Sequence, residues 1–307
     1  MAAAAAAVPV LRGTLLRDEP MAHHTTWRVG GPAEHYYVPA DRNDLVAYLR
    51  SLPTDEPVFW LGLGSNLLVR DGGIRGSVIA TAKGLTALAQ PGERRVYAEA
   101  GVSCAKFARF CARAGLAGAE FLAGIPGTLG GALAMNAGCF GGETWPLVVE
   151  VETIDRAGTV RRRTPLDFQV GYRSVKGPAG EWFIGATFQL TPSGEAEVLA
   201  QRVRELLEKR SASQPTQQAN AGSVFRNPAG DHAGRLIEAC GLKGTCIGGA
   251  CVSEKHANFI VNTGTATAAE IESLIAQVAD RVERQHGVRL HPEVKIVGEP
   301  RAGGETK

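Results

Sequence analysis

Short blocks of alternating apolar and polar residues dominate the first hundred positions, and glycine-rich turns separate them. Helical spacing of apolar residues predicts an amphipathic helix at residues 44–52, and period-two alternation predicts several short strands. The strands are expected at residues 57–61, 67–69, 77–81 and 96–99. Ser103 is suited to N-cap a further helix, which should end at Gly115.

The same mixture of helices and strands continues after a long glycine-rich stretch. Strands are expected at residues 147–154, 159–164 and 182–191, and helices at 195–209, 233–240 and 268–285. Residues 211–221 are rich in Gln, Ser and Ala and predict a linker. A separate C-terminal unit should begin there and close with a strand at 288–297. Because helices and strands do not alternate strictly, we expect an α+β fold.

Composition and charge exclude several kinds of partner. The 307 residues are 44% hydrophobic, which allows the cores of two or three domains. The 33 basic and 31 acidic side chains nearly cancel, so no global field would hold nucleic acid or an anionic membrane. No apolar run approaches the ~20 residues of a membrane span. The alanines after Met1 do not resemble an export signal, so residues 1–20 are expected to be a disordered tail on a cytoplasmic protein.

Cysteine and glycine usage indicates an intracellular protein whose backbone approaches a ligand closely. The six cysteines form no CxxC pair and are expected to be reduced thiols. Cys240, Cys246 and Cys251 precede His256, but their spacing matches no zinc pattern, so buried thiols are favoured over a metal site. The 38 glycines have no repeating period, which is typical of many tight turns and of cofactor cradles.

Two glycine-rich segments are candidates for binding a phosphate-bearing ligand. Residues 61–68 join two apolar strands, and consecutive N–H groups in such a turn can form an anion-binding nest. They match neither a Rossmann fingerprint nor a P-loop, so by themselves an ordinary hairpin turn is the better explanation. Residues 124–138 are nearly all small, and Thr128 can cap a short helix that faces phosphate, with a packed core helix as the alternative. Together the two segments favour a dinucleotide held without a Rossmann fold.

These loops and several further segments resemble, in order, the signatures of UDP-N-acetylenolpyruvoylglucosamine reductases. The further segments are His-Thr-Thr-Trp-Arg-Val-Gly-Gly-Pro-Ala at 24–33, Gly-Tyr-Arg-Ser at 171–174, Ala-Gly-Ser-Val-Phe-Arg-Asn-Pro at 221–228, Val-Ser-Glu-Lys-His-Ala-Asn-Phe at 252–259 and Leu-His-Pro-Glu-Val at 290–294. The resemblance covers almost the whole chain, and the ordered set is far more specific than any single segment. It is closest to the shorter subtype of the family, which lacks an inserted tyrosine-bearing substrate loop.

The resemblance implies a fold, a reaction and a set of small-molecule partners. The fold is a two-lobed FAD-binding domain of the vanillyl-alcohol-oxidase (PCMH) type at 21–195, with lobes at about 21–90 and 91–195, and a smaller α+β substrate-binding domain at 211–307. The implied reaction is reduction of UDP-N-acetylglucosamine enolpyruvate to UDP-N-acetylmuramate for peptidoglycan, with non-covalent FAD and with NADPH as co-substrate. A monomer is expected.

The resemblance also assigns the two loops to FAD. The residues expected to contact the cofactor are Gly62, Gly64, Ser65, Asn66, Leu67, Gly124, Ile125, Pro126, Gly127, Thr128, Gly130, Gly131, Ala132, Asn136, Ala137 and Gly138.

Three residues are implied as catalytic. Hydride addition to the enolpyruvyl group pushes negative charge toward its carboxylate, so the reaction needs a cation and a proton. By the resemblance, Arg173 pairs with the carboxylate, and Glu293 stabilises the enolate as an acid whose pKa rises beside the bound carboxylate. Ser223 donates the proton, with a relay completed by water, Glu293 or Lys255. Without the resemblance these residues would be a turn arginine, a solvated carboxylate and a capping serine.

Four positions are expected to bind the rest of the substrate. Asn227, Lys255 and His256 should contact the diphosphate and sugar, and Tyr172 should lie near the reacting end. An exposed polar pair is the alternative for Lys255 and His256. Cys246 stands where related sequences often have a longer basic or polar residue, so affinity should rest more on Lys255.

Two other functions are open on the sequence alone. Another flavin oxidase or dehydrogenase of this fold would share the glycine loops but lack the three catalytic residues. A flavin-binding or sugar-nucleotide-binding regulator would keep the loops without turnover.

Overall fold

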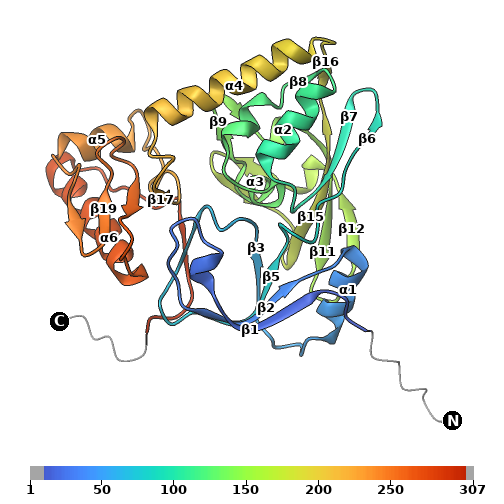
Figure 1. Ribbon diagram of the computed structural model, residues 1–307, viewed down its shortest axis with the longest axis horizontal. Coiled ribbons are helices and arrows are strands. Elements are labelled where there is room, and N and C mark those ends of the chain that lie inside the picture. Colours follow the sequence, from blue (N-terminus) through green and yellow to red (C-terminus); the bar gives the residue numbers. More distant parts are fainter. Residues whose placement is uncertain (1–9, 302–307) are drawn as a thin grey trace.

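Three groups of elements make up residues 10–301, the part of the chain that the computed structural model describes (Figure 1). The first is a sheet with the order β1-β2-β5-β3, at Thr14–Pro20, Pro32–Val38, Ile74–Ala80 and Val58–Leu61. Helix α1, Arg42–Ser51, begins where the Asp41 side chain accepts from the Asp44 N–H, and it packs Leu45 and Leu49 against the sheet. The helix predicted at 44–52 is confirmed, with an earlier start.

The second group is an antiparallel sheet covered by two helices. Its order is β12-β11-β15-β7-β6, at Val160–Arg163, Val148–Asp155, Glu181–Gln189, Arg95–Glu99 and Leu88–Gly92. Helix α2, Cys104–Arg113, packs Phe107 against Phe188 of β15 with ring centroids 4.7 Å apart. The Ser103 side chain accepts from the Lys106 N–H, which confirms the predicted N-cap. Helix α3, Leu129–Met135, also contacts β15 and β7.

Short elements connect these layers. The strands outside the three main sheets are β4 Leu67–Val69, β8 Leu116–Ala117, β9 Gly138–Cys139, β10 Gly142–Glu143, β13 Gln169–Gly171, β14 Ser174–Lys176, β16 Thr191–Pro192 and β21 Lys295–Val297. Single 3-10 turns occupy Met21–His23, Glu120–Gly124, Trp145–Leu147 and Pro165–Asp167. Between residues 10 and 301, no helix has the length and apolar character of a membrane span, and no three acidic, His or Cys side chains cluster as metal ligands.

Helix α4, Ala196–Ser213, leads from the second group to the third and runs across the top of Figure 1. The linker predicted at 211–221 therefore begins inside a helix. The third group is a sheet with the order β17-β20-β19-β18, at Ala219–Asn220, Ile260–Asn262, Ala250–Val252 and Cys246–Ile247. Helices α5, Ala233–Ala239, and α6, Ala268–His286, pack on it.

The C-terminal group completes its apolar core with residues from the N-terminal part of the chain. Its apolar core includes Trp27, Val29 and Leu68, and the Trp27 Nε1 donates to the Ile260 carbonyl oxygen at 2.8 Å. The closing strand is shorter than the predicted 288–297, and β21 pairs in parallel with β4 rather than with the C-terminal sheet. The Trp27 indole is thus buried with its N–H hydrogen-bonded, and this contact connects the N-terminal segment to the C-terminal group.

Residues 14–20 form part of a sheet, so the prediction of a disordered tail over 1–20 is wrong there. Strand β1 pairs antiparallel with β2, from Thr14 opposite Val38 to Pro20 opposite Pro32. It is an edge strand with mostly exposed side chains, which gives it no apolar pattern to detect. Residues 1–9, with the alanine tract, lie outside the described residues.

The lobe limit predicted at about residue 90 falls inside β6, which belongs to the second sheet.

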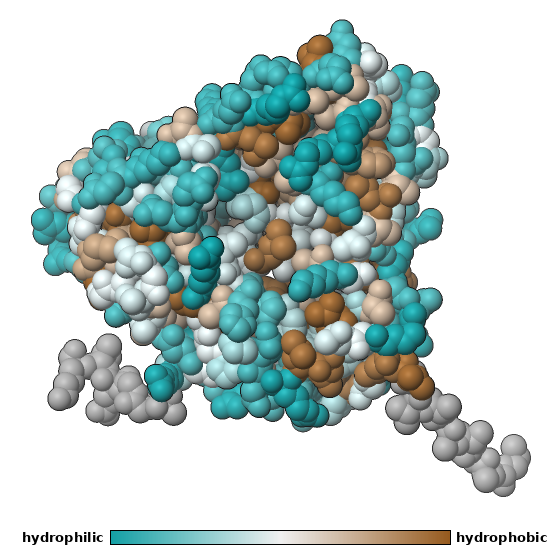
Figure 2. Space-filling model, in the orientation of Figure 1, coloured by the Kyte–Doolittle hydropathy of each residue, from teal (hydrophilic) through white to brown (hydrophobic). Residues whose placement is uncertain are grey.

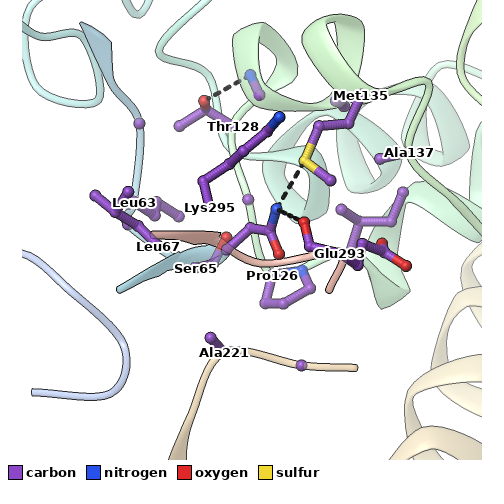
Figure 3. Close-up of a pocket in the computed structure, with 18 of the residues that line it drawn as sticks. Leu63, Ser65, Leu67, Pro126, Thr128, Met135, Ala137, Ala221, Glu293 and Lys295 are labelled. Atoms are coloured by element: carbon purple, nitrogen blue, oxygen red, sulfur yellow. Dashed lines mark hydrogen bonds between the residues drawn. The ribbon is translucent and has the colours of Figure 1, made fainter. Parts of the chain in front are cut away.

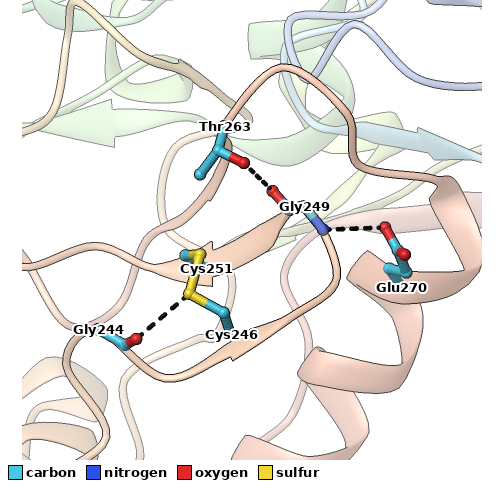
Figure 4. Close-up of a disulfide and its surroundings, with 6 residues drawn as sticks. All are labelled: Gly244, Cys246, Gly249, Cys251, Thr263 and Glu270. Carbon is cyan, nitrogen blue, oxygen red and sulfur yellow. Dashed lines mark hydrogen bonds between the residues drawn. A yellow bond between two sulfur atoms is a disulfide. The ribbon is translucent and has the colours of Figure 1, made fainter.

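The β18–β19 hairpin carries a disulfide between Cys246 and Cys251, shown in Figure 4. The two residues are paired directly across the antiparallel ladder, with Cα atoms 4.1 Å apart. The prediction that all cysteines are reduced is therefore wrong for this pair, because strand register brings together residues whose sequence spacing suggested no pairing. The other four cysteines are free.

Loss of this disulfide is expected to reduce stability modestly. It joins residues only five positions apart, and closing so short a loop is worth about 2 kcal/mol of unfolding free energy. We expect the double variant Cys246→Ser, Cys251→Ser to lose about that amount in urea unfolding, and dithiothreitol to bring the wild type to the same value. Thiol titration of the denatured protein without reductant should count four thiols; a count that includes all the cysteines would contradict the pairing.

Candidate active site

A cavity of about 520 Å³ opens where the three groups of elements meet, at the hollow in the centre of the face in Figure 2. Its walls come from segments far apart in the sequence: loops 62–67 and 124–139, Arg173, segment 221–223 and strand end 293–297. The lining is mostly small or apolar, with a few charged side chains that converge on the space. This combination is typical of an enzyme active site.

The two glycine-rich loops predicted to bind cofactor both line this cavity and lie close to each other, and Figure 3 labels residues of both. A Cβ added at Gly62 would lie 2.5 Å from Thr128 Oγ1, so a side chain there would close the gap between the loops. A Cβ at Gly127 would lie 3.4 Å from Ser65 Oγ. Thr128 accepts from the Gly131 N–H at the start of α3, which confirms the predicted cap.

The turn between β3 and β4 presents unused main-chain donors. Within residues 10–301, the N–H groups of Leu63, Gly64, Ser65 and Asn66 donate to no protein acceptor. Gly64 adopts a left-handed φ of 62°, which bends the turn. The strands on either side belong to different sheets, so the turn is not the ordinary hairpin that was the alternative. A row of free N–H groups in a bent turn is suited to a phosphate.

A second cavity of about 300 Å³ adjoins the first. The two share part of their lining, namely Trp60, Leu61, Gly62, Thr128, Gly131 and Ala134. Aromatic residues, including Phe168 and Trp182, line its far part. Two cavities with a shared lining, beside a turn with a row of free amides, suit the phosphates of a dinucleotide, so the residues present fit FAD.

Arg173 lies at the tip of the two-stranded β13–β14 hairpin and lines the cavity. Its φ is 52°, a left-handed conformation that residues other than glycine rarely adopt. Its Nη2 donates to the Gly138 carbonyl oxygen at 2.5 Å, and its Nη1 donates to that of Asn136 at 3.4 Å. These bonds hold the guanidinium at the cavity wall.

Glu293 lies beside Arg173, with Oε1 3.1 Å from Nε. The two side chains are only 15% and 19% exposed, but the Nε–H does not point at the oxygen, so the contact is an ion pair without a hydrogen bond. Burial raises the pKa of Glu293 more than the charges of Arg173 and Arg226 lower it. This rise comes from burial in the free protein, whereas the rise expected from the sequence concerned the protein with a bound carboxylate and stays a prediction.

Ser223 lies next to Glu293 because two distant segments pair at this point. Phe225 and Pro292 form an isolated bridge, and the Glu293 N–H donates to the Val224 carbonyl oxygen at 2.7 Å. Both Ser223 and Glu293 line the cavity, and no described residue hydrogen-bonds the serine hydroxyl. The hydroxyl is therefore free to interact with a bound molecule.

Two residues assigned to FAD do not line the main cavity. Gly130 lines the second cavity. Asn136 is 1% exposed and lines neither, because its side chain is used entirely by protein groups. A direct contact between the Asn136 side chain and FAD is therefore not supported.

None of the four positions predicted to bind substrate lines the cavity. Asn227 is exposed, and its Oδ1 accepts from the first N–H of α5. Lys255 is exposed, and its amine donates to a main-chain oxygen at the end of α4, so it completes no relay with Ser223 here. The ring of His256 accepts from a main-chain N–H, and burial lowers its pKa. Tyr172 is 52% exposed beside Arg173.

Several lining residues were not predicted, among them Met135, Arg210, Gln214 and Lys295. Lys295 follows Glu293 by two positions, and strand alternation puts such residues on one face, so the spacing contained a usable signal. Arg210 and Gln214 come from the end of α4, where the Arg210 Nε donates to Gln214 Oε1 at 3.0 Å. The sequence predicted a charged helix up to residue 209 and a polar linker from residue 211, and neither indicated a site.

The burial of Glu293 should appear in the pH dependence of stability. A carboxyl whose pKa is raised by folding holds its proton more tightly in the folded state, so its contribution to stability falls as pH rises above the unfolded value of about 4.3. Glu293→Gln removes this titration. The free energy of unfolding of the wild type, relative to the variant, is therefore expected to decrease in urea titrations as the pH rises above about 4.3, until the carboxyl is ionised in the folded state as well. A difference that stays constant or increases would contradict the shift.

Together, the fold and the site define an FAD-binding oxidoreductase with a second domain that closes the active site. A family model described as "FAD binding domain" matches residues 33–164, and one described as "UDP-N-acetylenolpyruvoylglucosamine reductase, C-terminal domain" matches residues 214–297. These matches confirm the predicted α+β fold of the PCMH type and the use of FAD.

Whole-chain relatives show the family. The chain is 64% identical over 287 residues to the UDP-N-acetylenolpyruvoylglucosamine reductase of Alkalilimnicola ehrlichii, which covers 94% of this chain and 96% of the relative. It is 62% identical over 291 residues to that of Methylococcus capsulatus, covering 95% of each. The crystal structure of the reductase from Thermus caldophilus superimposes with a TM-score of 0.78 at 33% identity, over 94% of this chain and 99% of that one. The chain belongs to the UDP-N-acetylenolpyruvoylglucosamine reductase family.

Proposed function

We propose that this chain reduces UDP-N-acetylglucosamine enolpyruvate to UDP-N-acetylmuramate, a step of peptidoglycan synthesis, with NADPH as the electron source. The observation that carries the proposal is the convergence of Arg173, Ser223 and Glu293, from three separate segments, on one cavity beside two cofactor loops. Family membership supports the same reaction. We further propose a monomer acting in the cytoplasm.

The two loops would hold FAD, which supplies hydride transfer when bound. The free amides after β3 would bind its phosphates, and the absence of a side chain at Gly62 and Gly127 lets the two loops approach each other closely. This part of the chain orients the cofactor and contributes no proton chemistry.

Arg173 would bind the substrate carboxylate. A guanidinium presents parallel donors to two carboxylate oxygens and stays charged as negative charge grows on the carboxylate during the reaction. In the free protein its partner is Glu293, at 3.1 Å. Arrival of the substrate carboxylate would therefore compete with Glu293 and favour protonation of that side chain, in the direction that burial already sets.

Ser223 would deliver the proton to the substrate carbon. Its hydroxyl faces the cavity, and the main-chain bond between Glu293 and Val224 keeps the serine and the acid adjacent. A hydroxyl is a weak acid, so its proton must be replaced from Glu293 or from water. Lys255 is not part of this relay, because its amine is engaged at the end of α4.

We propose that Asn227, Lys255 and His256 contact the diphosphate and sugar where the substrate extends over the C-terminal group, and that Tyr172 covers the reacting end. Lys255 is exposed and carries the charge that suits a phosphate.

The test is an anaerobic cycle in two steps. The purified protein is loaded with FAD and reduced with NADPH, then mixed with UDP-N-acetylglucosamine enolpyruvate, while flavin absorbance is followed and the product is identified by mass spectrometry. Rapid reoxidation with recovery of UDP-N-acetylmuramate is expected. A protein that is reduced but ignores this substrate would overturn the proposed substrate, and one that binds no FAD would overturn the cofactor assignment as well.

A further inference from the structure

The hairpin that carries Arg173 has little structure of its own. Strands β13 and β14 form a two-stranded sheet of three residues each, and an isolated hairpin of this size is only marginally stable in water. Phe168, just before β13, and Val175 of β14 pack against the core of the second group. Val170, which is paired with Val175, and Tyr172 at the tip are exposed, so the apolar core does not hold the tip in place.

The tip also has a strained backbone. Arg173 is in the left-handed region, which costs a residue other than glycine of order 1 kcal/mol or more unless surrounding contacts impose it. Contacts that specify this conformation must come from outside the hairpin. Helix α3, which packs against β14, supplies them at its C-terminal end.

Asn136 is the residue at that end. It caps α3 with a left-handed φ of 46° and is almost fully buried. Its Nδ2 donates to the Gly171 carbonyl oxygen at 3.2 Å and to Glu143 Oε2 at 2.9 Å, and its Oδ1 accepts from the Trp145 N–H at 3.1 Å. Every hydrogen-bonding group of the amide is therefore used by the protein.

Two of the Asn136 contacts converge on the catalytic arginine. Its side chain holds the carbonyl of Gly171, two residues before Arg173, while its own carbonyl oxygen accepts from Arg173 Nη1. The Gly138 carbonyl, which accepts from Nη2, lies on the short β9 strand, and β9 pairs with β10, where Glu143 is located. One buried amide thus links the hairpin tip, the guanidinium acceptors and the end of α3.

We infer that Asn136 is a positioning residue for Arg173 rather than a ligand of FAD. It fixes the hairpin tip and the guanidinium at the point where the substrate carboxylate arrives. The inference rests on the proposed function, because it assigns Asn136 to the step in which Arg173 acts. Loss of the Asn136 side chain should therefore displace the Arg173 guanidinium slightly, while FAD stays bound to the two glycine-rich loops.

Two variants separate positioning from general stability. Asn136→Asp keeps a residue that tolerates the left-handed conformation and keeps the oxygen that accepts from Trp145, but it removes the donor to Gly171. Asn136→Gly keeps the backbone conformation and avoids a carboxylate beside Glu143, so it covers the case in which the Asp variant does not fold. Asn262→Asp is the matched control, since it removes a similar donor, to the Trp27 carbonyl oxygen at 2.9 Å, and neither Asn262 nor Trp27 lines the cavity.

The expected result is a loss confined to one half-reaction. In FAD-loaded Asn136 variants, flavin reoxidation by the enolpyruvyl substrate should slow by about 10- to 100-fold, as for a catalytic group displaced by about 1 Å, while reduction by NADPH changes less than about threefold. Affinity for UDP-N-acetylmuramate, which carries the carboxylate, should fall, and affinity for UDP-N-acetylglucosamine, which lacks it, should not. Asn262→Asp should lower the melting temperature without this selectivity.

Two results would contradict a positioning role for Asn136. Wild-type reoxidation rates in both Asn136 variants, or equal losses in both half-reactions together with lost FAD, would overturn the positioning role. If the wild type itself fails to reoxidise with the enolpyruvyl substrate, the proposed function falls and the inference with it, so the two failures are distinguishable.

Discussion

Replacement of Ser223 by alanine is expected to slow reoxidation of the reduced flavin by the enolpyruvyl substrate by about 10²- to 10⁴-fold, the usual cost of losing a positioned proton donor. The serine lines the cavity, and the main-chain bond from Glu293 to Val224 keeps it beside a carboxyl with a raised pKa. Reduction of FAD by NADPH requires no proton on a substrate carbon, so its rate should be unchanged. Anaerobic stopped-flow absorbance measures the two half-reactions separately.

Ser103→Ala is the matched control for this variant. Ser103 caps α2, so its loss should cost about 1 kcal/mol of unfolding free energy but leave both half-reactions intact. Wild-type reoxidation in Ser223→Ala would remove the serine as donor. An equal loss in both half-reactions would point to a disturbed cofactor site instead.

Replacement of Arg173 by methionine is expected to slow reoxidation by about 10²- to 10³-fold, as for loss of one preorganised group that stabilises developing negative charge. Two main-chain carbonyl oxygens hold the guanidinium at the wall of the cavity. A water molecule in its place would carry no charge and would not be held in a fixed orientation. Glu293 can take up a proton rather than remain an unpaired buried charge, so the fold should survive the change. Arg173→Lys should recover part of the rate, since it keeps the charge but loses the fork.

Arg70→Met provides the comparison for Arg173. Arg70 pairs with Glu272 through two bonds of 2.9 and 2.8 Å, and neither residue lines the cavity, so its loss removes a more exposed ion pair but no group of the site. Substrate reoxidation at the wild-type rate in Arg173→Met would rule out the proposed carboxylate contact. A rate loss of similar size in Arg70→Met would show that the effect is not specific to the site.

Elements specified by neighbouring residues were predictable from the sequence. Helix α6 was expected at 268–285 and spans Ala268–His286, because Thr267 and Glu270 form a capping box and Gly287 ends the helix in a left-handed conformation. Strand β4 was expected at its observed limits, and Thr128 caps α3 as its position suggested. Turn formation, helix capping and hydrophobic periodicity each depend on residues a few positions apart, so they can be recognised in the amino-acid sequence.

Features that depend on distant contacts were not predictable in this way. Strand β1 has no apolar face, and only its register with β2 gives it a structure. Cys246 and Cys251 meet through strand pairing, and Arg210 reaches the cavity because α4 spans two groups of elements. Asn136 illustrates the same limit: its place in a glycine-rich motif suggested cofactor contact, whereas its neighbours in space are Gly171, Glu143 and Trp145.

By itself, the sequence of this protein determined its family, its class of fold, most helices and strands, and the loops and residue types suited to FAD and to an anionic substrate. Only the tertiary structure decided that β21 joins β4, that Trp27 completes the core of the C-terminal domain, and that Arg173, Ser223 and Glu293 share one cavity. The physical reason is the distance along the chain between the residues that interact. Backbone propensity and capping are local, whereas burial, ion pairing and pKa depend on which side chains meet after the chain has folded.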